Sequence, residues 1–392
     1  MHTRRSFLQI GSSNKVENKN ADILIYVFQR GAADGLNLVV PYGDENYYAN
    51  RPSIAIAKPN SSEGAALDLD GFFGLNPALS ALLPIYQSND LAMVHACGSL
   101  NSSHSHFKAQ DDVDRGALNQ DINSGWLARY ANSYENNDST AFKSVALSKS
   151  IPKSLSSAEQ VVALDNIASF VIKAPESESV DIQNNLLTLF AGATSLDKVA
   201  QATFNGLEEV ASINPEDFPV ENDATYPSSG FGNRFKDLAL LIKSGIGVEM
   251  ASIDIGGWDT HNDENTALTP LAQDFAETLA TFYTDMGDRM QNITIIALTE
   301  FGRRVAENGS GGTDHGTGNV AFVMGGSVNG GQVFTDWPGL RAEDLVGPGD
   351  LLPTTDYRTV IAELMEKRMN YTNFEELFPD FEVPEYLGIF KN

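Results

Sequence analysis

Cysteine is almost absent from this chain of 392 residues, which has only Cys97, so no disulfide can form within the chain. Basic residues are also scarce: Lys and Arg total 26 against 52 Asp and Glu, for a formal net charge of −26. A chain this acidic lacks the basic surface that nucleic acid or anionic lipid requires. No stretch reaches the ~18 apolar residues that span a bilayer. We therefore expect no nucleic-acid partner and no stable membrane insertion.

Apolar residues are present in ordinary amounts. Hydrophobic residues make up 42% of the chain and aromatic residues 9%. This composition excludes a chain that is mainly disordered. A chain of this length can bury roughly three quarters of its unfolded surface, so we expect a large core.

The N-terminus carries adjacent arginines, Arg4 and Arg5, followed by Ser-Phe-Leu. This arrangement resembles the start of a twin-arginine export signal. The apolar stretch that should follow is missing, because the sequence turns polar directly after Ile10. We interpret residues 1–20 as a degenerate or shortened signal that is disordered. That interpretation predicts a periplasmic or extracellular protein, and a chance basic N-terminus is the alternative.

Five apolar runs predict buried strands. They lack polar alternation, as is typical of strands covered on both faces of a mostly parallel sheet. They lie at 23–28, 91–96, 247–253, 293–298 and 320–324. Helical spacing is found between them at 77–86, 186–211, 231–244, 268–290 and 356–369. The alternation of strands and helices predicts an α/β fold with a parallel core.

The segment 140–230 differs in composition, being rich in Ser, Asn, Glu and Ala, with weak strands around 143–147 and 160–164. We interpret it as a helical insertion on the same core. Residues 21–392 are then a single α/β domain.

Candidate chemistry gathers at the ends of the predicted strands, where open α/β sheets bind ligands. Asp34 follows the first strand and can ligate a metal or close an Asx-turn, and this segment alone favours the turn. Ser103 and Ser105 stand beside His104 and His106 before a helix. A hydroxyl at a helix N-terminus suits a nucleophile that attacks a phosphoryl or sulfuryl group. The alternative is plain N-capping, which leaves the paired histidines unexplained.

Two later segments add metal-ligand types. Asp259 and His261 are two residues apart on a loop after a strand, and both can reach one cation. Glu300 ends another strand, and Asp314 and His315 follow a glycine-rich loop.

The arginines Arg303 and Arg304 offer bidentate donors to an oxyanion, or are a pair of surface charges. Four of the six histidines fall in these segments. The combination predicts metal-assisted hydrolysis of a phosphate or sulfate ester.

These motifs resemble the bacterial domain of unknown function 1501 family over about residues 22–370. The resemblance is carried by residues 30–43, 105–111, 256–261, 300–304 and 313–316. That family is typically exported by the twin-arginine route and has no settled substrate. It is placed in the alkaline phosphatase and sulfatase superfamily. The resemblance therefore implies an alkaline phosphatase-like three-layer sandwich with a mostly parallel central sheet.

The superfamily pattern also implies roles for particular residues. Its metal-binding Asp after the first strand corresponds to Asp34, and its nucleophile to Ser105, with Ser103 next. The remaining metal ligands that the pattern implies are Asp259, His261, Glu300 and His315, and Asp314 is a further candidate beside them. The chain departs from the pattern where Glu300-Phe301 replaces an Asp-His pair, and where one residue rather than three separates Asp259 from His261. His106 or Asp314 can replace the missing imidazole. The site can therefore hold either one ion or two.

The leading hypothesis is an exported, metal-dependent hydrolase with one or two divalent ions, such as zinc, calcium, magnesium or manganese. Its substrate is an anionic small-molecule or polysaccharide ester. The acidic chain repels such a substrate, so metals with Arg30, Arg303 or Arg304 must supply positive charge. The alternative hypothesis is a non-catalytic exported protein that uses the same fold to bind a surface polymer or a partner.

Overall fold

The computed structural model covers the chain with several gaps. It describes residues 22–60, 62, 64–99, 103–118, 122–133, 140–171, 179–379 and 381–391. The export signal and the disorder predicted for residues 1–20 lie outside the described residues.

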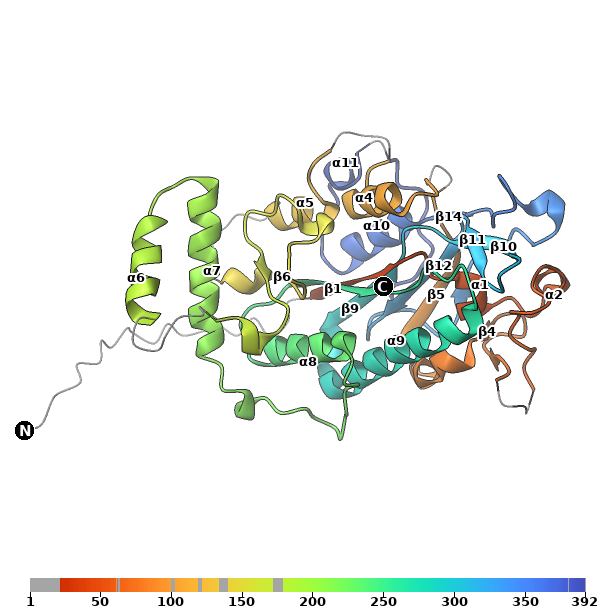
Figure 1. The fold of residues 1–392 in the computed structure, drawn as a ribbon, viewed down its shortest axis with the longest axis horizontal. Coiled ribbons are helices and arrows are strands. Elements are labelled where there is room, and N and C mark those ends of the chain that lie inside the picture. The colour runs from red at the N-terminus through yellow and green to blue at the C-terminus, as the bar shows by residue number, and fades with distance from the viewer. Residues whose placement is uncertain are drawn as a thin grey trace, which may run out of the picture.

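A large sheet forms the centre of the molecule (Figure 1). Nine described strands make it up, in the order β13 (Val333–Phe334), β5 (Leu91–Gly98), β12 (Asn319–Met324), β9 (Ile293–Leu298), β1 (Ile23–Arg30), β8 (Met250–Gly256), β6 (Ser144–Ala146) and β7 (Val162–Ala163), with β14 (Thr355–Asp356) also beside β5. All five predicted strands are present. In β1, residues 24–28 are wholly buried, because helices cover both faces of the sheet.

The sheet is mostly parallel, and the predicted α/β class is confirmed. One strand departs from the prediction of a parallel core: β12 runs antiparallel to both β5 and β9. Parallel neighbours need a crossover, usually a helix. Between β9 and β12 the chain forms only the hairpin of β10 (Arg303–Glu307) and β11 (Thr313–His315), and then returns along the same side.

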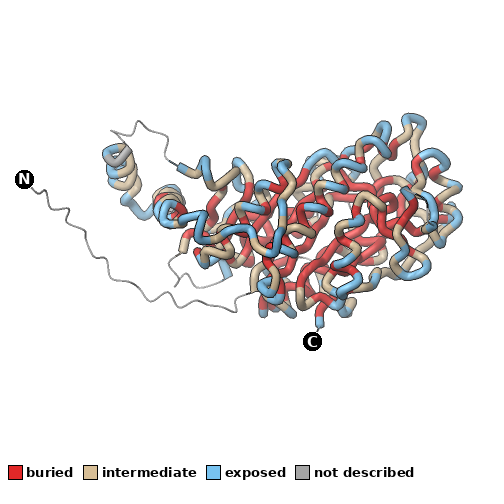
Figure 2. The backbone as a smooth tube through the Cα atoms, turned by 90° about the horizontal axis from the view of Figure 1, so that it is seen from below, coloured by how far each residue is buried: buried red, intermediate tan, exposed pale blue. Residues whose placement is uncertain are grey.

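Helices form a layer on each face of the sheet, giving three layers (Figure 1). One face packs against α8 (Gly230–Lys243), α9 (Glu264–Met286) and α3 (Leu83–Gln87). The other face packs against α4 (His106–Arg115), α5 (Trp126–Asn132), α10 (Tyr357–Lys367) and α11 (Phe374–Leu377). Figure 2 shows buried backbone through the middle of this body. The helix predicted at 268–290 begins earlier, at Glu264, and contains Pro270.

The segment 140–230 contributes β6 and β7 to the sheet edge and two helices that project from the body (Figure 1). The single helix predicted at 186–211 is wrong. The structure has α6 (Ser179–Leu189) and α7 (Ser195–Ala211) instead. Thr194 and Asp197 form a capping box that starts α7, so the chain begins a new helix there.

Smaller elements complete the chain. The remaining described strands and α-helices are α1 (Gly35–Leu38), β2 (Val39–Val40), α2 (Glu45–Asn50), β3 (Leu67–Asp68) and β4 (Gly74–Leu75). Short 3-10 helices lie at Pro77–Leu82, Ala141–Lys143, Lys153–Leu155, Ile167–Ser169, Pro215–Asp217, Gly287–Asn292 and Ala342–Asp344. Within the described ranges, no helix is long and apolar enough to cross a membrane.

The carboxyl ends of β1, β5, β8 and β9 meet at one edge of the sheet, because these strands share one direction. The predicted motifs follow these ends, so the fold brings them together.

Candidate metal centre

Three histidine side chains surround one oxygen of Asp259, which follows β8. Asp259 Oδ1 lies 3.4 Å from His106 Nε2, 3.2 Å from His261 Nε2 and 3.4 Å from His315 Nε2. His106 starts α4, His261 lies on the loop after β8, and His315 ends β11. Ligand atoms of His106, Asp259 and His315 all lie within 4.8 Å of one another. Residues far apart in the sequence thus form one cluster of potential metal ligands.

The outer nitrogen of each ring faces an acceptor. His106 Nδ1 lies 2.8 Å from Glu300 Oε1, and His315 Nδ1 lies 2.8 Å from the backbone oxygen of His104. His261 Nδ1 lies 3.5 Å from Asp314 Oδ1. A carbonyl oxygen only accepts, so Nδ1 of His315 must carry the proton. Histidines that bind metal are held in this way by outer partners.

The Nε2 atoms of these rings point at one another. His261 Nε2 and His315 Nε2 are only 2.8 Å apart. His315 Nε2 accepts a hydrogen bond from His261 when His261 carries its proton on Nε2; when that proton is on Nδ1, the two lone pairs repel each other and a cation between them would relieve the repulsion. His106 Nε2 is buried and has no hydrogen-bond partner within the described part of the chain. His106, Asp259 and His315 therefore form a group of ligands that fits a divalent cation, with His261 beside it.

Glu300 lies behind the cluster rather than in it. Its buried Oε1 accepts hydrogen bonds from the backbone N–H of Gly31 and from Gln110 Nε2, each at 2.8 Å, besides facing His106. Thr299 Oγ1 donates to Oε2 at 2.9 Å. Burial alone would raise the pKa of Glu300, but the hydrogen bonds from His106 and Gln110 outweigh it and lower the pKa. Glu300 is thus ionised and orients His106.

Burial, hydrogen bonds and neighbouring charges shift the pKa values of residues in the cluster. The hydrogen bond to Glu300 raises the pKa of His106. Burial, together with the charges of its neighbours His106 and Arg303, lowers the pKa of His315. Burial would raise the pKa of Asp259, but the hydrogen bond and charge of Arg303 lower it. Asp259 is therefore ionised at neutral pH.

Arg303 is buried beneath the cluster. Its guanidinium donates to Asp259 Oδ1 at 2.7 Å and to the backbone oxygens of Gly31, Ala32, Trp258 and Thr313. Its donors are thus directed into the protein and anchor the loops that carry the ligands.

Arg304 is partly exposed and lies 3.7 Å from Asp314 Oδ2. Asp314 accepts a hydrogen bond from Asn308 Nδ2 at 3.2 Å, which with the charge of Arg304 lowers its pKa. Asp314 therefore contacts His261 from outside the cluster.

Asp34 lies apart from the cluster, in a buried group with Arg51. Arg51 Nη1 donates to Asp34 Oδ2 at 2.6 Å, and Asp34 Oδ1 caps α1 by accepting from Leu36 N at 3.0 Å. Burial would raise the pKa of Asp34, but the charge of Arg51 outweighs it and the pKa falls. Burial and the charge of Asp34 raise the pKa of the neighbouring Glu264 to about 8. Asp34 thus has a built-in cation as its partner.

The two candidate nucleophiles lie at the start of α4. Ser105 is the N-cap residue and is exposed, but its hydroxyl does not cap the helix. Ser103 Oγ accepts a hydrogen bond from Ser105 N at 3.2 Å. The hydroxyl of Ser105 is therefore the freer of the two.

Sequence reasoning missed several residues of this site. Asp350 is buried, and its Oδ2 lies 2.9 Å from His104 Nε2, so it fixes the residue whose carbonyl holds His315. Phe301, expected only as a substitute for a histidine, packs its ring 5.0 Å from that of His106 and 4.9 Å from that of His315. Asp350 stands in a loop with no neighbouring motif, so no local signal indicates it.

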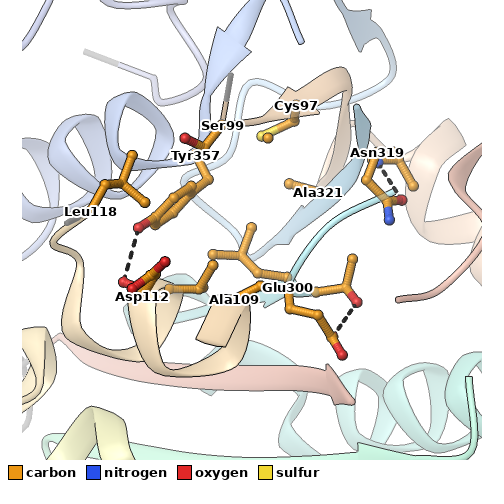
Figure 3. A pocket seen from close by; sticks show the side chains of 14 residues that line it. Cys97, Ser99, Ala109, Asp112, Leu118, Glu300, Asn319, Ala321 and Tyr357 are labelled. Carbon is orange, nitrogen blue, oxygen red and sulfur yellow. Dashed lines mark hydrogen bonds between the residues drawn. The ribbon is translucent and has the colours of Figure 1, made fainter. Parts of the chain in front are cut away.

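A small cavity lies beneath α4, beside Glu300 (Figure 3). Its volume is about 20 Å³, and its wall includes Ala109, Glu300, Cys97 and Tyr357. A space this small holds about one water molecule. It is too small to hold a small-molecule ligand.

Several solved structures are similar to this one. The alkaline phosphatase from the Antarctic bacterium TAB5 matches with a TM-score of 0.34 and 11% identity, over 78% of this chain and 92% of that one. The lipoteichoic acid synthase LtaP from Listeria monocytogenes matches with a TM-score of 0.34 and 9% identity, over 94% and 74%. The PsFucS1 sulfatase from Pseudoalteromonas sp. matches with a TM-score of 0.29 and 11% identity, over 80% and 64%. Values this low identify no function.

No curated protein matches the chain by sequence. A family model described as "Protein of unknown function (DUF1501)" matches residues 92–378. The match covers more than half of the chain, although the motif at residues 30–43 lies before it. The chain therefore belongs to the DUF1501 family, as its motifs predicted.

Proposed function

We propose that this protein is a metal-dependent hydrolase of phosphate or sulfate esters. One observation carries the proposal: the Nε2 atoms of His106, His261 and His315 converge on Asp259 Oδ1, while the outer nitrogens face acceptors. Three part-buried imidazoles that converge on one carboxylate oxygen are the arrangement that a bound cation requires. The three histidines and Asp259 would hold that ion.

A metal ion bound there would supply positive charge that neutralises an oxyanion and lowers the pKa of a nearby hydroxyl. Ser105 is the proposed nucleophile, because it is exposed and next to His106, at the positive end of α4. Glu300 and Asp350 hold the surrounding histidine residues in place.

The substrate we propose is an anionic small-molecule or polysaccharide ester. The arginines of the motifs contribute little free charge to attract it. Arg303 is directed inward, and Arg30 pairs with Asp114 at 2.9 Å and Asp254 at 3.0 Å. Arg304 is the partly exposed one that remains. The ion must therefore provide most of the attraction for the anion.

Zinc suits this donor set better than the other candidates. Three imidazole nitrogens and a carboxylate are typical of zinc, whereas calcium and magnesium prefer oxygen ligands. We propose one ion per chain, because Asp34 is already paired with Arg51.

Metal analysis tests the centre directly. Protein purified without chelators should hold about one divalent ion per chain, and Asp259→Asn should lose it. Asp288→Asn is the matched control, because Asp288 is exposed beyond the far end of α9. A wild type that holds no metal after reconstitution with zinc, manganese or magnesium would sink the proposal.

Turnover of p-nitrophenyl phosphate and p-nitrophenyl sulfate tests the chemistry. Ser105→Ala should lower kcat by about 10³-fold or more, as loss of a nucleophile does, and Ser103→Ala should retain activity. Loss of activity in Ser103→Ala alone would transfer the nucleophile role to that residue.

A non-catalytic binding protein is the second candidate. It is favoured by the hydrogen bonds that fully engage Asp34 and Arg303. Metal bound at one ion per chain, with no turnover of either ester, would support it.

The adjacent Arg4 and Arg5 support export to the periplasm or beyond. Cell fractionation should find the wild type outside the cytoplasm, and Arg4→Lys with Arg5→Lys should retain it inside.

A further inference from the structure

The hairpin of β10 and β11 packs its tip against the loop that carries His261. Gly312 lies so close to this loop that a Cβ there would clash with the backbone of His261. At the same tip, the N–H of Glu264 donates to the backbone oxygen of Gly311 at 2.8 Å. His261 stands on irregular chain between β8 and α9, so its position depends on contacts of this kind.

One side chain at the tip, that of Asn308, uses its whole hydrogen-bonding capacity. Its Oδ1 accepts from the N–H groups of Ser310 and Gly312, at 2.8 and 3.2 Å. Its Nδ2 donates to the backbone oxygen of His261 at 2.9 Å and to Asp314 Oδ1 at 3.2 Å. Backbone N–H groups only donate and a carbonyl oxygen only accepts, so the amide has one possible orientation. Asn308 thus joins the turn of the hairpin to the loop that carries His261.

The contact with Asp314 extends this support to the ring of His261. Asp314 Oδ1 is the outer partner of that ring and lies 3.5 Å from Nδ1. The rings of His106 and His315 have outer partners at 2.8 Å. His261 is therefore the histidine whose ring is held least closely by its own partner, and Asn308 holds both its backbone and that partner.

We infer that Asn308 is a positioning residue of the metal centre, which keeps the imidazole of His261 turned toward the ion. It acts through His261 and is not itself a ligand. The inference rests on the proposed metal centre. When the Nδ2 contacts are lost, we expect His261 to leave the ion, while His106, Asp259 and His315 retain it.

Asn308→Asp tests the Nδ2 contacts, because it keeps the oxygen that accepts from the turn of the hairpin. Competition with a chromogenic chelator should show an affinity for zinc about 10–100-fold below that of the wild type. The added negative charge would by itself favour a cation, so a lower affinity must come from the lost contacts. In cobalt-loaded protein, the visible absorption per bound ion should change, because one nitrogen ligand is lost.

Asn308→Ala, which adds no charge, should show the same loss of affinity and the same change in the spectrum. The matched control is Asn60→Asp. Asn60 lies on an exposed loop, where its Oδ1 accepts from Ser62 N at 2.6 Å and its Nδ2 donates to the backbone oxygen of Lys58 at 2.9 Å. This variant should keep the wild-type affinity and the wild-type spectrum.

A double variant separates positioning from a general loosening of the site. If Asn308 acts through His261, adding Asn308→Asp to His261→Ala should lower the affinity no further. An unchanged affinity and spectrum in Asn308→Asp and Asn308→Ala would overturn the inference. A full further loss in the His261→Ala background would also overturn it. Either result in a chain whose wild type binds one ion would leave the proposed function standing, whereas a wild type that binds no ion would overturn both.

Discussion

The carboxylates of Asp259 and Asp34 follow neighbouring strands at one sheet edge, yet their surroundings differ. Asp34 is buried and takes a bidentate contact from Arg51, at 2.6 and 3.2 Å. Asp259 is half exposed, and three imidazole nitrogens lie within 3.4 Å of its Oδ1. The carboxylate of Asp34 is thus enclosed with Arg51, whereas that of Asp259, which accepts from Arg303 at 2.7 Å, is also surrounded by imidazoles that can bind an external cation.

This contrast shows that the residue type at a strand end does not decide whether it binds metal. Both carboxylates have an arginine partner, so the exposure of the carboxylate and the imidazoles around it decide whether an ion can bind.

Removing the built-in cation should have the largest effect. Arg51→Met leaves Asp34 buried without its partner, so the free energy of unfolding should fall by about 3–5 kcal/mol. Urea denaturation measures this. Adding Asp34→Asn to the variant should recover part of the loss, because the uncompensated charge disappears. Arg341→Met is the control, since Arg341 pairs with Asp344 at the surface and should leave the midpoint unchanged.

The number of ions bound by Arg51→Met also tests whether Asp34 can be a metal ligand. If Arg51→Met bound two ions per chain where the wild type bound one, Asp34 would be a competent ligand that Arg51 normally displaces. We expect one ion.

A metal ion bound at the site around Asp259 should stabilise the folded protein. Zinc at a thousandfold its Kd should raise the free energy of unfolding of the metal-free protein by about 4 kcal/mol. Calorimetry with and without a chelator measures the shift in melting temperature. His315→Ala should show no shift. An equal shift in that variant would mean that zinc stabilises the protein from another site.

The sequence predicts the parallel strands and the histidine cluster for identifiable reasons. Buried strands such as β1 are apolar throughout, which is a local signal. Histidine is rare in this chain, so four at strand ends indicate a shared site. The antiparallel direction of β12 has only an indirect signal, which is that no helix is predicted between the strands at 293–298 and 320–324 to make the crossover that parallel strands need.

The turn that Asp34 closes was predicted from its segment, but its pairing with Arg51 could not be. Its partner Arg51 lies 17 residues away in a segment without a motif. Glu264 approaches this group from the start of α9 and bonds Asn37 Nδ2 at 2.7 Å. Tertiary packing alone makes these contacts, so no spacing in the sequence indicates them.

The buried group should also make stability depend on pH. The pKa of Glu264 is about 8 in the folded chain against an ordinary 4.5. Between these values the unfolded state holds fewer protons than the folded state. Stability therefore falls as pH rises from 5 to 8, by at most about 1.4 kcal/mol per pH unit. The pKa of Asp34 is lowered, so it titrates below this window.

Urea denaturation of metal-free protein across pH 5–8 measures this slope. Glu264→Gln should flatten it relative to the wild type. The control is Glu277→Gln, an exposed residue of the same helix, which should keep the wild-type slope. Parallel slopes in the wild type and Glu264→Gln would show that Glu264 is ionised in the folded chain across this pH range. Its raised pKa would then be wrong.

The smallest effect is expected at Glu300. The family resemblance implies that Glu300 is a metal ligand, whereas the geometry shows that it orients the ligand His106. Glu300→Gln retains an oxygen that can accept from His106 Nδ1 but removes its charge. Loss of such an outer partner lowers metal affinity by about 10–100-fold. Competition with a chromogenic chelator measures it. Gln110→Ala, which removes one donor to Glu300, should have a weaker effect in the same direction. Asp34→Asn should have none. If Glu300→Gln abolished metal binding as completely as Asp259→Asn does, the Glu300 carboxylate would have to contact the ion itself. Glu300 would then be a ligand like Asp259, and not the outer partner that its hydrogen bonds indicate.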